Sequence, residues 1–227
     1  MTSSAVPTTI DGRRRVAVWD APVRIVHWLL VLLIPFSWWT AGQEMMEWHY
    51  RSGLVVLGLV LFRLIWGVVG SSTARFASFV RGPRSLVDYL RGRREFVLGH
   101  NPLGALSVLA LLFMLSLQVG LGLFAADEDG LESGPLAHLI EAETAEQVAE
   151  LHETSFDVLK WLIALHVAAI LYYLLVRRKN LVGPMVTGAA PAPAAAAPMV
   201  AAPRWRAAVS ALAAFAAVSA VWYAGAG

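Results

Sequence analysis

The sequence predicts an all-α integral membrane protein, in which a four-helix transmembrane bundle is followed by a fifth, C-terminal transmembrane helix. Hydrophobic residues make up 58% of the 227 residues, and charged residues make up only 15%, which is low for a soluble domain of this size. Several apolar runs are long enough to cross a hydrocarbon layer about 30 Å thick. Basic and acidic segments alternate along the chain between these runs. Together these observations predict repeated crossings of a membrane.

The first two helices are expected near the N-terminus. The first covers residues 25–42 and follows Asp20 and Pro22, which favour a helix start. A cleaved signal peptide is the alternative for this arginine-preceded run, but the run is longer than a signal core and lacks a clear cleavage site of small residues. The second helix covers residues 48–69 and is interrupted only by Arg63.

Two further helices complete the predicted bundle. The third covers residues 101–125, is capped by Asn101 and carries no charged residue before the acidic loop that follows it. The fourth is expected to begin near Thr144, which could form a capping box with Gln147, and to continue to Val176.

The chain divides into four segments on composition. Residues 1–15 form an N-terminal cytoplasmic segment, and residues 16–187 form the transmembrane domain. Residues 188–203 are rich in alanine and proline and are expected to be an extended linker. Residues 204–227 are expected to hold the fifth membrane helix, with an interfacial helix as the alternative.

The charge distribution predicts the orientation in the membrane. Residues 1–24, 71–99 and 177–206 contain 15 of the 18 lysines and arginines, whereas residues 125–160 contain ten acidic residues. The positive-inside rule therefore places the N-terminus and the three basic segments in the cytoplasm and the acidic loop outside. This arrangement requires an even number of crossings before residue 177, which agrees with four helices.

Two histidines in the fourth helix suggest two separate centres. His152 and His166 are fourteen residues apart, so they share one helix face and lie about 21 Å apart along the axis. That separation is too large for one metal ion. A titratable side chain inside a membrane helix is costly, which makes each of these histidines a candidate for a functional site.

The predicted topology gives each of these histidines a partner at the same depth. His49 begins the second helix at the outer side, level with His152. His27 lies near the cytoplasmic end of the first helix, on the same side as His166. Each pair could hold one metal ion axially from two helices of a bundle. Hydrogen-bonded structural histidines are the alternative.

Haem b is the group that best fits two such pairs. The chain has no cysteine, which excludes c-type haem attachment, iron–sulfur clusters and disulfides. A porphyrin supplies four ligands of its own, whereas zinc would need three or four protein ligands at one depth. Arg63 lies fourteen residues after His49 and could bind a propionate of the inner haem or extend to the inner interface instead. His100 is expected to be interfacial and His138 solvated.

The same residues carry a resemblance to a known family. The segments VWDAPVRIVHW around His27, WHYRSG and RLIWG around His49 and Arg63, LGHNPLG, and the short motifs at His152 and His166 occur in the order and spacing of the bacterial cytochrome b561 and nickel–iron hydrogenase b-type cytochrome family. The resemblance covers residues 16–182.

The resemblance implies a di-haem b-type cytochrome of the bacterial cytoplasmic membrane. In this family, ligands on the first, second and fourth helices hold two haems, which matches His27, His49, His152 and His166. It also implies electron exchange between membrane quinone and a periplasmic redox partner, such as a hydrogenase-like subunit or a c-type cytochrome. Such a chain is expected to be an electron-transfer subunit and not a catalytic subunit on its own, with no nucleic-acid partner.

Two other function classes are compatible with a helical membrane protein. A histidine-dependent transporter of protons or metal ions would be expected to carry ionisable residues at mid-membrane in several broken helices, and the first and third helices show none. A non-redox subunit of a membrane assembly is the third possibility. A reduced-minus-oxidised spectrum distinguishes both from a cytochrome.

Overall fold

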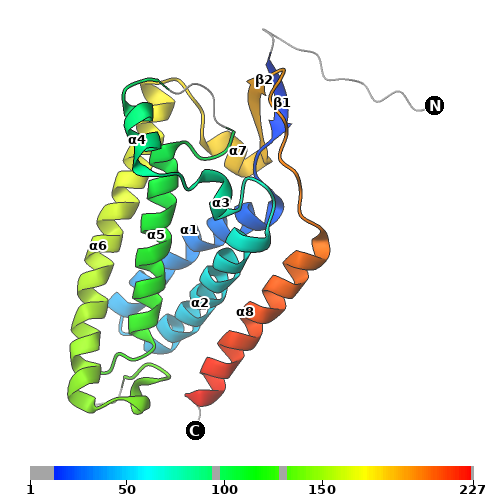
Figure 1. The fold of residues 1–227 in the computed structure, drawn as a ribbon. Helices are drawn as coiled ribbons and strands as arrows, with labels where there is room; N and C mark the ends of the chain where they lie inside the picture. Colours follow the sequence, from blue (N-terminus) through cyan, green and yellow to red (C-terminus); the bar gives the residue numbers. More distant parts are fainter. Residues whose placement is uncertain (1–12, 94–97, 128–131, 226–227) are drawn as a thin grey trace.

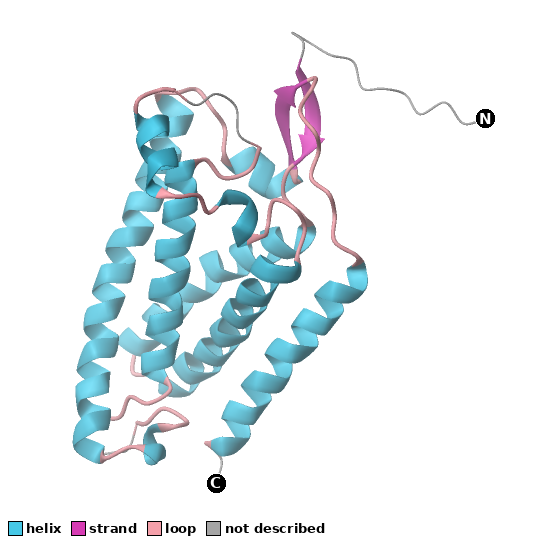
Figure 2. Ribbon diagram, viewed as in Figure 1, coloured by secondary structure: helices cyan, strands magenta, loops and turns pink. Residues whose placement is uncertain are grey.

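The fold is helical, with a single pair of short strands in the part of the chain that the structure describes (Figures 1 and 2). The structure is a computed structural model, and it describes residues 13–93, 98–127 and 132–225. Within these ranges, five helices are long and apolar enough to cross a membrane: α1 (Ala21–Gly42), α2 (Met46–Val69), α5 (Pro102–Gly122), α6 (Ala142–Leu175) and α8 (Arg204–Ala224). The predicted fold class is therefore confirmed.

The four predicted bundle helices lie side by side as two pairs. Helix α1 packs along α2 and α5 packs along α6, while α2 also contacts α5 (Figure 1). At one end of the bundle, called the loop end here, are the turn from α1 to α2 and the loop that holds the short helix η1 (Ala137–Leu139). The opposite end, called the strand end, carries five short elements: β1 (Arg13–Ala17), α3 (Phe76–Phe79), α4 (Pro83–Leu90), α7 (Val182–Thr187) and β2 (Ala189–Pro193).

The N-terminal caps of α1 and α5 involve residues that the sequence predicts, whereas the cap expected for α6 is not formed. The Asp20 carboxylate accepts a hydrogen bond from the Val23 amide at 2.9 Å, and the Asn101 side chain accepts one from the Gly104 amide at 2.7 Å. Helix α6 begins at Ala142, with no side-chain bond at its N-cap residue. The expected capping box from Thr144 is therefore wrong, because the helix already includes that residue.

The alanine- and proline-rich segment is held against the N-terminal part of the chain. Strand β2 pairs antiparallel with β1, so that Val16 lies opposite Ala190. The buried residues Val16, Val18 and Ala192 form a small apolar cluster beneath the two strands. Further along, the Met199 amide donates to the Ala17 carbonyl at 2.9 Å. The segment expected to be an extended linker thus contributes a strand to the strand end of the bundle.

Helix α8 packs against α2, outside the four-helix bundle (Figure 1). Gly58 of α2 allows a close approach, since a Cβ built there would lie 3.4 Å from a methyl group of Val218. The Arg206 guanidinium donates to the carbonyl of Val69 at 3.1 Å and so caps the end of α2. No candidate histidine lies on α8, so this helix supports the bundle from one side.

Candidate functional site

At the loop end, His49 of α2 and His152 of α6 face each other. Their ring centres are 6.1 Å apart and the rings are perpendicular. An imidazole nitrogen binds a transition metal at about 2 Å, and the ring centre lies about 1 Å behind it, so two axial imidazoles on one ion have ring centres roughly 6 Å apart. At this separation the two rings could hold one metal ion between them.

Backbone carbonyls fix the orientation of both rings at the loop end. Nδ1 of His49 donates to the carbonyl of Ser37 at 2.9 Å, and Nδ1 of His152 donates to the carbonyl of Gln118 at 2.9 Å. A carbonyl oxygen can only accept, so Nδ1 carries the proton in each ring and Nε2 keeps its lone pair. Metal-binding histidines are commonly held in this way, with the second nitrogen bonded to a carbonyl.

Helix α5 makes room for His152 by means of a glycine. A Cβ built at Gly122 would lie 2.8 Å from Cε1 of His152, which is closer than a real Cβ contact allows. Gly120, two residues earlier, has nothing within 4 Å of such a Cβ. Only Gly122 is therefore required for the position of the His152 ring.

The centre of the bundle is a packed apolar layer. It consists of Val56 and Val60 of α2, Leu115 of α5 and Leu159 of α6, all buried. Leu159 is seven residues from each of the two α6 histidines, so the layer lies midway between them. It separates the loop end of the bundle from the strand end without a charged or polar side chain of its own.

At the strand end, His27 of α1 and His166 of α6 occupy the second level. His27 lies in the first two turns of α1, and His166 lies in the strand-end part of α6. Nδ1 of His166 is 3.4 Å from the hydroxyl of Ser107 on α5. Nδ1 of His27 is buried and has no hydrogen-bond partner among the described residues. A buried polar atom without a partner is costly, which is consistent with a site that is completed by another group.

Arg63 brings a positive charge to this second level. The residue is 6% exposed, and its Nη1 has no hydrogen-bond partner in the described part of the chain. The guanidinium lies over the ring of Phe76, 5.2 Å from the ring centre. A buried cation is stabilised by an anion. A carboxylate bound beside the guanidinium would neutralise this charge.

His100 is enclosed by aromatic rings near the same level. Its ring centre is 4.5 Å from that of Trp19 and 4.6 Å from that of Phe79. Burial, with smaller contributions from the charges of Arg63 and His166, lowers the pKa of His100 to about 3. His100 is therefore neutral at ordinary pH. His138, at the loop end, is exposed, as expected of a solvated side chain.

Polar side chains also join three helices at the strand end, beyond His166. The hydroxyls of Tyr89 on α4 and Tyr173 on α6 are 2.8 Å apart, and the Asn101 amide donates to Tyr89 at 3.0 Å. Burial and the bond to Tyr173 raise the pKa of Tyr89 to about 12. These bonds fix the strand-end part of α6, on which His166 lies.

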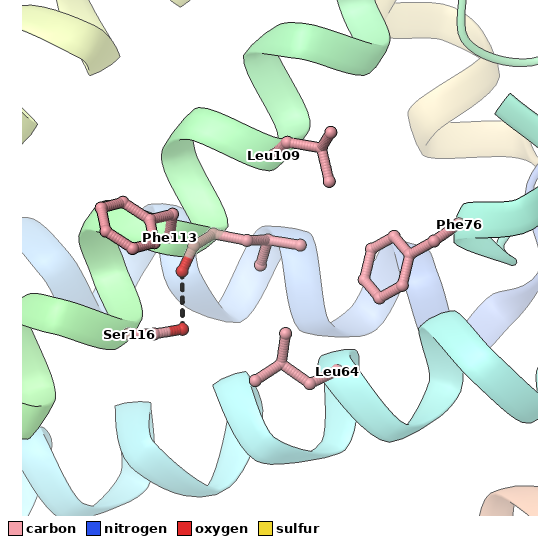
Figure 3. A pocket seen from close by; sticks show the side chains of 6 residues that line it. Leu64, Phe76, Leu109, Phe113 and Ser116 are labelled. Atoms are coloured by element: carbon pink, nitrogen blue, oxygen red, sulfur yellow. Dashed lines mark hydrogen bonds between the residues drawn. The ribbon is translucent and has the colours of Figure 1, made fainter. Parts of the chain in front are cut away.

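An apolar cavity of about 270 Å³ lies between α2, α3 and α5 (Figure 3). The Ser116 hydroxyl donates to the Leu112 carbonyl of its own helix at 2.6 Å, so it offers no free donor to the cavity. The Phe76 ring that underlies Arg63 forms one wall. The lining residues are Leu64, Phe76, Leu109, Leu112, Phe113 and Ser116.

The donor set decides which group the two histidine levels can hold. Among the described residues, no three side chains of histidine, cysteine, aspartate or glutamate converge on a point. A metal ion held at either level would thus need further ligands from a group with donor atoms of its own, as in a porphyrin. The paired imidazoles, the protonated Nδ1 atoms of the loop-end pair and the buried Arg63 fit haem b with carboxylate side chains.

The sequence did not single out the polar residues that hold these rings. Ser37 and Ser107 are small hydroxyl residues of a kind that is common in membrane helices. Gln118 is different, because an amide within a long apolar run is a detectable signal. Its contact with His152 could not be predicted, since the two residues are far apart in the chain.

Comparison with known protein families matches residues 18–188 to the family described as prokaryotic cytochrome b561. The match includes α1, α2, α5 and α6 with all four candidate histidines, and it ends before α8. Comparisons with curated proteins and with solved structures found no match.

Proposed function

The chain belongs to the prokaryotic cytochrome b561 family, and we propose on this basis that it carries electrons across the cytoplasmic membrane between two haem b groups. Membership of the family indicates a multi-pass membrane protein that binds b-type haem and transfers electrons. The number of haems, their ligands, the orientation and the partners are what we propose here.

The observation that carries the proposal is the geometry at the loop end. His49 and His152 lie with ring centres 6.1 Å apart, and Nε2 carries no proton in either ring because Nδ1 donates to a backbone carbonyl. In His152 this Nε2 lies 3.1 Å from the Gln118 side-chain amide, which a bound metal group would displace from the lone pair. One haem would be held by this pair. The bound haem supplies a one-electron change at its iron, and the protein holds both rings in the tautomer and orientation that binding requires.

A second haem would be held at the strand end by His27 and His166. Arg63 would bind a propionate of this haem, since its buried guanidinium has no acidic partner within salt-bridge distance among the described residues. A carboxylate there would receive charge-assisted hydrogen bonds from the arginine. His100 is neutral and offers no competing charge.

The apolar layer between the two levels supports a function in which electrons, and not ions, cross the bundle. Val56, Val60, Leu115 and Leu159 fill the space between the two histidine pairs. An ion would have to be desolvated in order to cross this layer, which is costly. An electron can pass through it between two nearby redox groups.

The charges outside the membrane support an orientation and a type of partner. The arginine-rich segments at the strand end would face the cytoplasm, and the acidic residues at the loop end would face the periplasm. Glu141, Glu143 and Glu150 are exposed there and would favour a redox protein with a basic surface. A membrane quinone is the proposed small-molecule substrate, as the family resemblance implies.

The test of this function is a count of haem groups in the purified protein. We expect a b-type reduced-minus-oxidised spectrum and two haems per chain. Replacing His152 by alanine should remove one haem and leave the other, and His166→Ala should remove the second one instead. His138→Ala is the control, because this exposed residue should leave both in place. A protein without b-type absorbance, or with one haem per chain, contradicts the proposal.

A further inference from the structure

Gln118 is a buried amide in a helix that is otherwise almost wholly apolar. It lies near the loop end of α5 and is 8% exposed. A primary amide in a membrane interior is unfavourable unless its donors and its acceptor are bonded. The hydrogen bonds of its side chain therefore show how this buried amide is stabilised.

The side chain of Gln118 is directed to His152. Its amide nitrogen lies 3.1 Å from Nε2 and 3.2 Å from Nδ1 of that ring, about midway between them. Nδ1 already donates its proton to the backbone carbonyl of the same glutamine. One residue of α5 thus contacts the His152 ring twice, with its backbone oxygen and with its amide group.

A serine of α6 holds the amide in this orientation. The hydroxyl of Ser155 donates to the side-chain oxygen of Gln118, and Ser155 is itself buried at 8% exposure. Because that oxygen is taken by Ser155, the NH₂ group of the amide must point to the ring. Gly122, one turn further along α5, leaves the space into which the ring fits.

We propose that Gln118 is a positioning residue for the loop-end haem, which acts through the ligand His152 and sets the reduction potential of that haem. This inference rests on the proposed function, since it requires a haem at His49 and His152. Ser155 contributes to the same effect because its hydrogen bond fixes the orientation of the Gln118 amide. Gln118 makes no bond to the metal itself.

The sign of the effect follows from the direction of the amide dipole. The N–H end of the amide is positive and lies against the ring of the ligand. Positive charge near the iron favours the reduced state, which carries one positive charge less than the oxidised state. Removal of the amide should therefore lower the potential of the loop-end haem and leave the strand-end haem unchanged.

The experiment is a redox titration of the purified full chain, followed at the b-type absorbance and by the low-spin ferric signals in electron paramagnetic resonance. Gln118→Met keeps the length of the side chain and removes its N–H donors. We expect about a tenfold lower ratio of reduced to oxidised haem at the wild-type midpoint of the loop-end haem, which corresponds to a shift of about 59 mV for one electron. Ser155→Ala should produce a smaller shift in the same direction.

Ser116→Ala is the matched control. Ser116 lies on the same helix, but its hydroxyl donates to the Leu112 carbonyl and does not contact His152. Both haems should keep their potentials in this variant. If a substitution in α5 acted only by loosening the helix, Ser116→Ala would also shift the potential of the loop-end haem. That result would overturn the role of Gln118.

The outcomes separate this inference from the proposed function. A wild-type protein without a haem at His49 and His152 refutes the function and the inference with it. Two haems in the wild type with unchanged potentials in Gln118→Met overturn the inference alone, as does a shift confined to the strand-end haem. If Gln118→Met does not assemble, the potential of the loop-end haem is compared between Ser155→Ala and Ser116→Ala. Equal potentials in these two variants reject the proposal.

Discussion

Individual side chains at the two histidine levels differ in how they are bonded. The loop-end rings of His49 and His152 are fixed by backbone carbonyls, whereas the strand-end level contains buried atoms of His27 and Arg63 without partners in the described residues. Side chains that are already hydrogen-bonded favour binding because they are preorganised. Side chains without partners favour binding because the bound group supplies their missing interactions. In the proposed arrangement the loop-end site is therefore formed in advance, while the strand-end site would be completed by its haem.

The charge of Arg63 should matter for retention of the strand-end haem. We expect Arg63→Met to release that haem more readily, by roughly ten- to a hundredfold in its dissociation constant, because a hydrogen bond to a charged group is worth about 1.5–3 kcal/mol. The measurement is haem transfer to excess apomyoglobin over time. Arg63→Lys keeps the charge and should restore part of the retention. Equal release rates from Arg63→Met and the wild type would show that no propionate is bound there.

His100 should make stability depend on pH. Its pKa in the folded chain is lowered to about 3 by burial and by the charges of Arg63 and His166, compared with 6.5 for a free side chain. The unfolded chain therefore takes up a proton as the pH falls below 6.5 while the folded chain does not, so stability decreases in the window from pH 6.5 down to 3.

The prediction for His100 is tested by thermal unfolding in detergent at pH 7 and pH 5. Between these values the group should cost at most about 2 kcal/mol, from 1.36 kcal/mol per pH unit below 6.5. His100→Phe keeps an aromatic ring between Trp19 and Phe79 and should reduce the loss on acidification. An identical loss in this variant and in the wild type would mean that other groups cause the pH dependence.

Helix α5 contributes to the site although it carries no candidate ligand. Its residues Ser107, Gln118 and Gly122 contact the two histidines of α6, and Leu115 belongs to the apolar layer between them. The four lie at intervals of three to eight residues, so they return to the side of α5 that faces α6. The polar and small residues of α5 therefore lie on the side of the helix that contacts α6.

Two glycines of α5 offer a matched test of that arrangement. Gly122→Val should displace His152, because even a Cβ at this position would lie 2.8 Å from the ring, and the loop-end haem should be lost. Gly120→Val introduces the same side chain where nothing lies within 4 Å, and it should keep both haems. The measurement is haem per chain in the two variants. Loss of haem in both, or in neither, would argue against a specific contact with His152.

Across the whole molecule, the strand end and the loop end differ in charge and in structure. The strand end gathers arginine-rich segments around β1 and β2, and the loop end carries the exposed acidic residues. Helix α8 runs from the strand end back to the loop end alongside α2 (Figure 1). Membrane orientation is thus a property of the complete chain, to which each charged segment contributes.

The absence of cysteine from the sequence allows a direct test of this orientation. Ser133→Cys at the loop end and Arg178→Cys at the strand end both replace exposed residues. A membrane-impermeant maleimide added to intact bacterial cells with a permeable outer membrane should label the first and not the second, which should react only after lysis. The reverse pattern would invert the proposed orientation and place the acidic surface in the cytoplasm.

The sequence by itself determined the five apolar helices, the levels of the histidines and the shared face of His152 and His166. These are properties of short stretches of chain, since hydropathy predicts a membrane helix and its periodicity determines which residues share a face. Only the tertiary structure decided the separation and orientation of the His49 and His152 rings, which the sequence had paired by depth. It alone also decided that Gln118 and Ser155 hold the His152 ring, that β2 pairs with β1 and that α8 packs on α2. Each of these contacts joins residues far apart in the chain, and such contacts depend on how all the helices pack together.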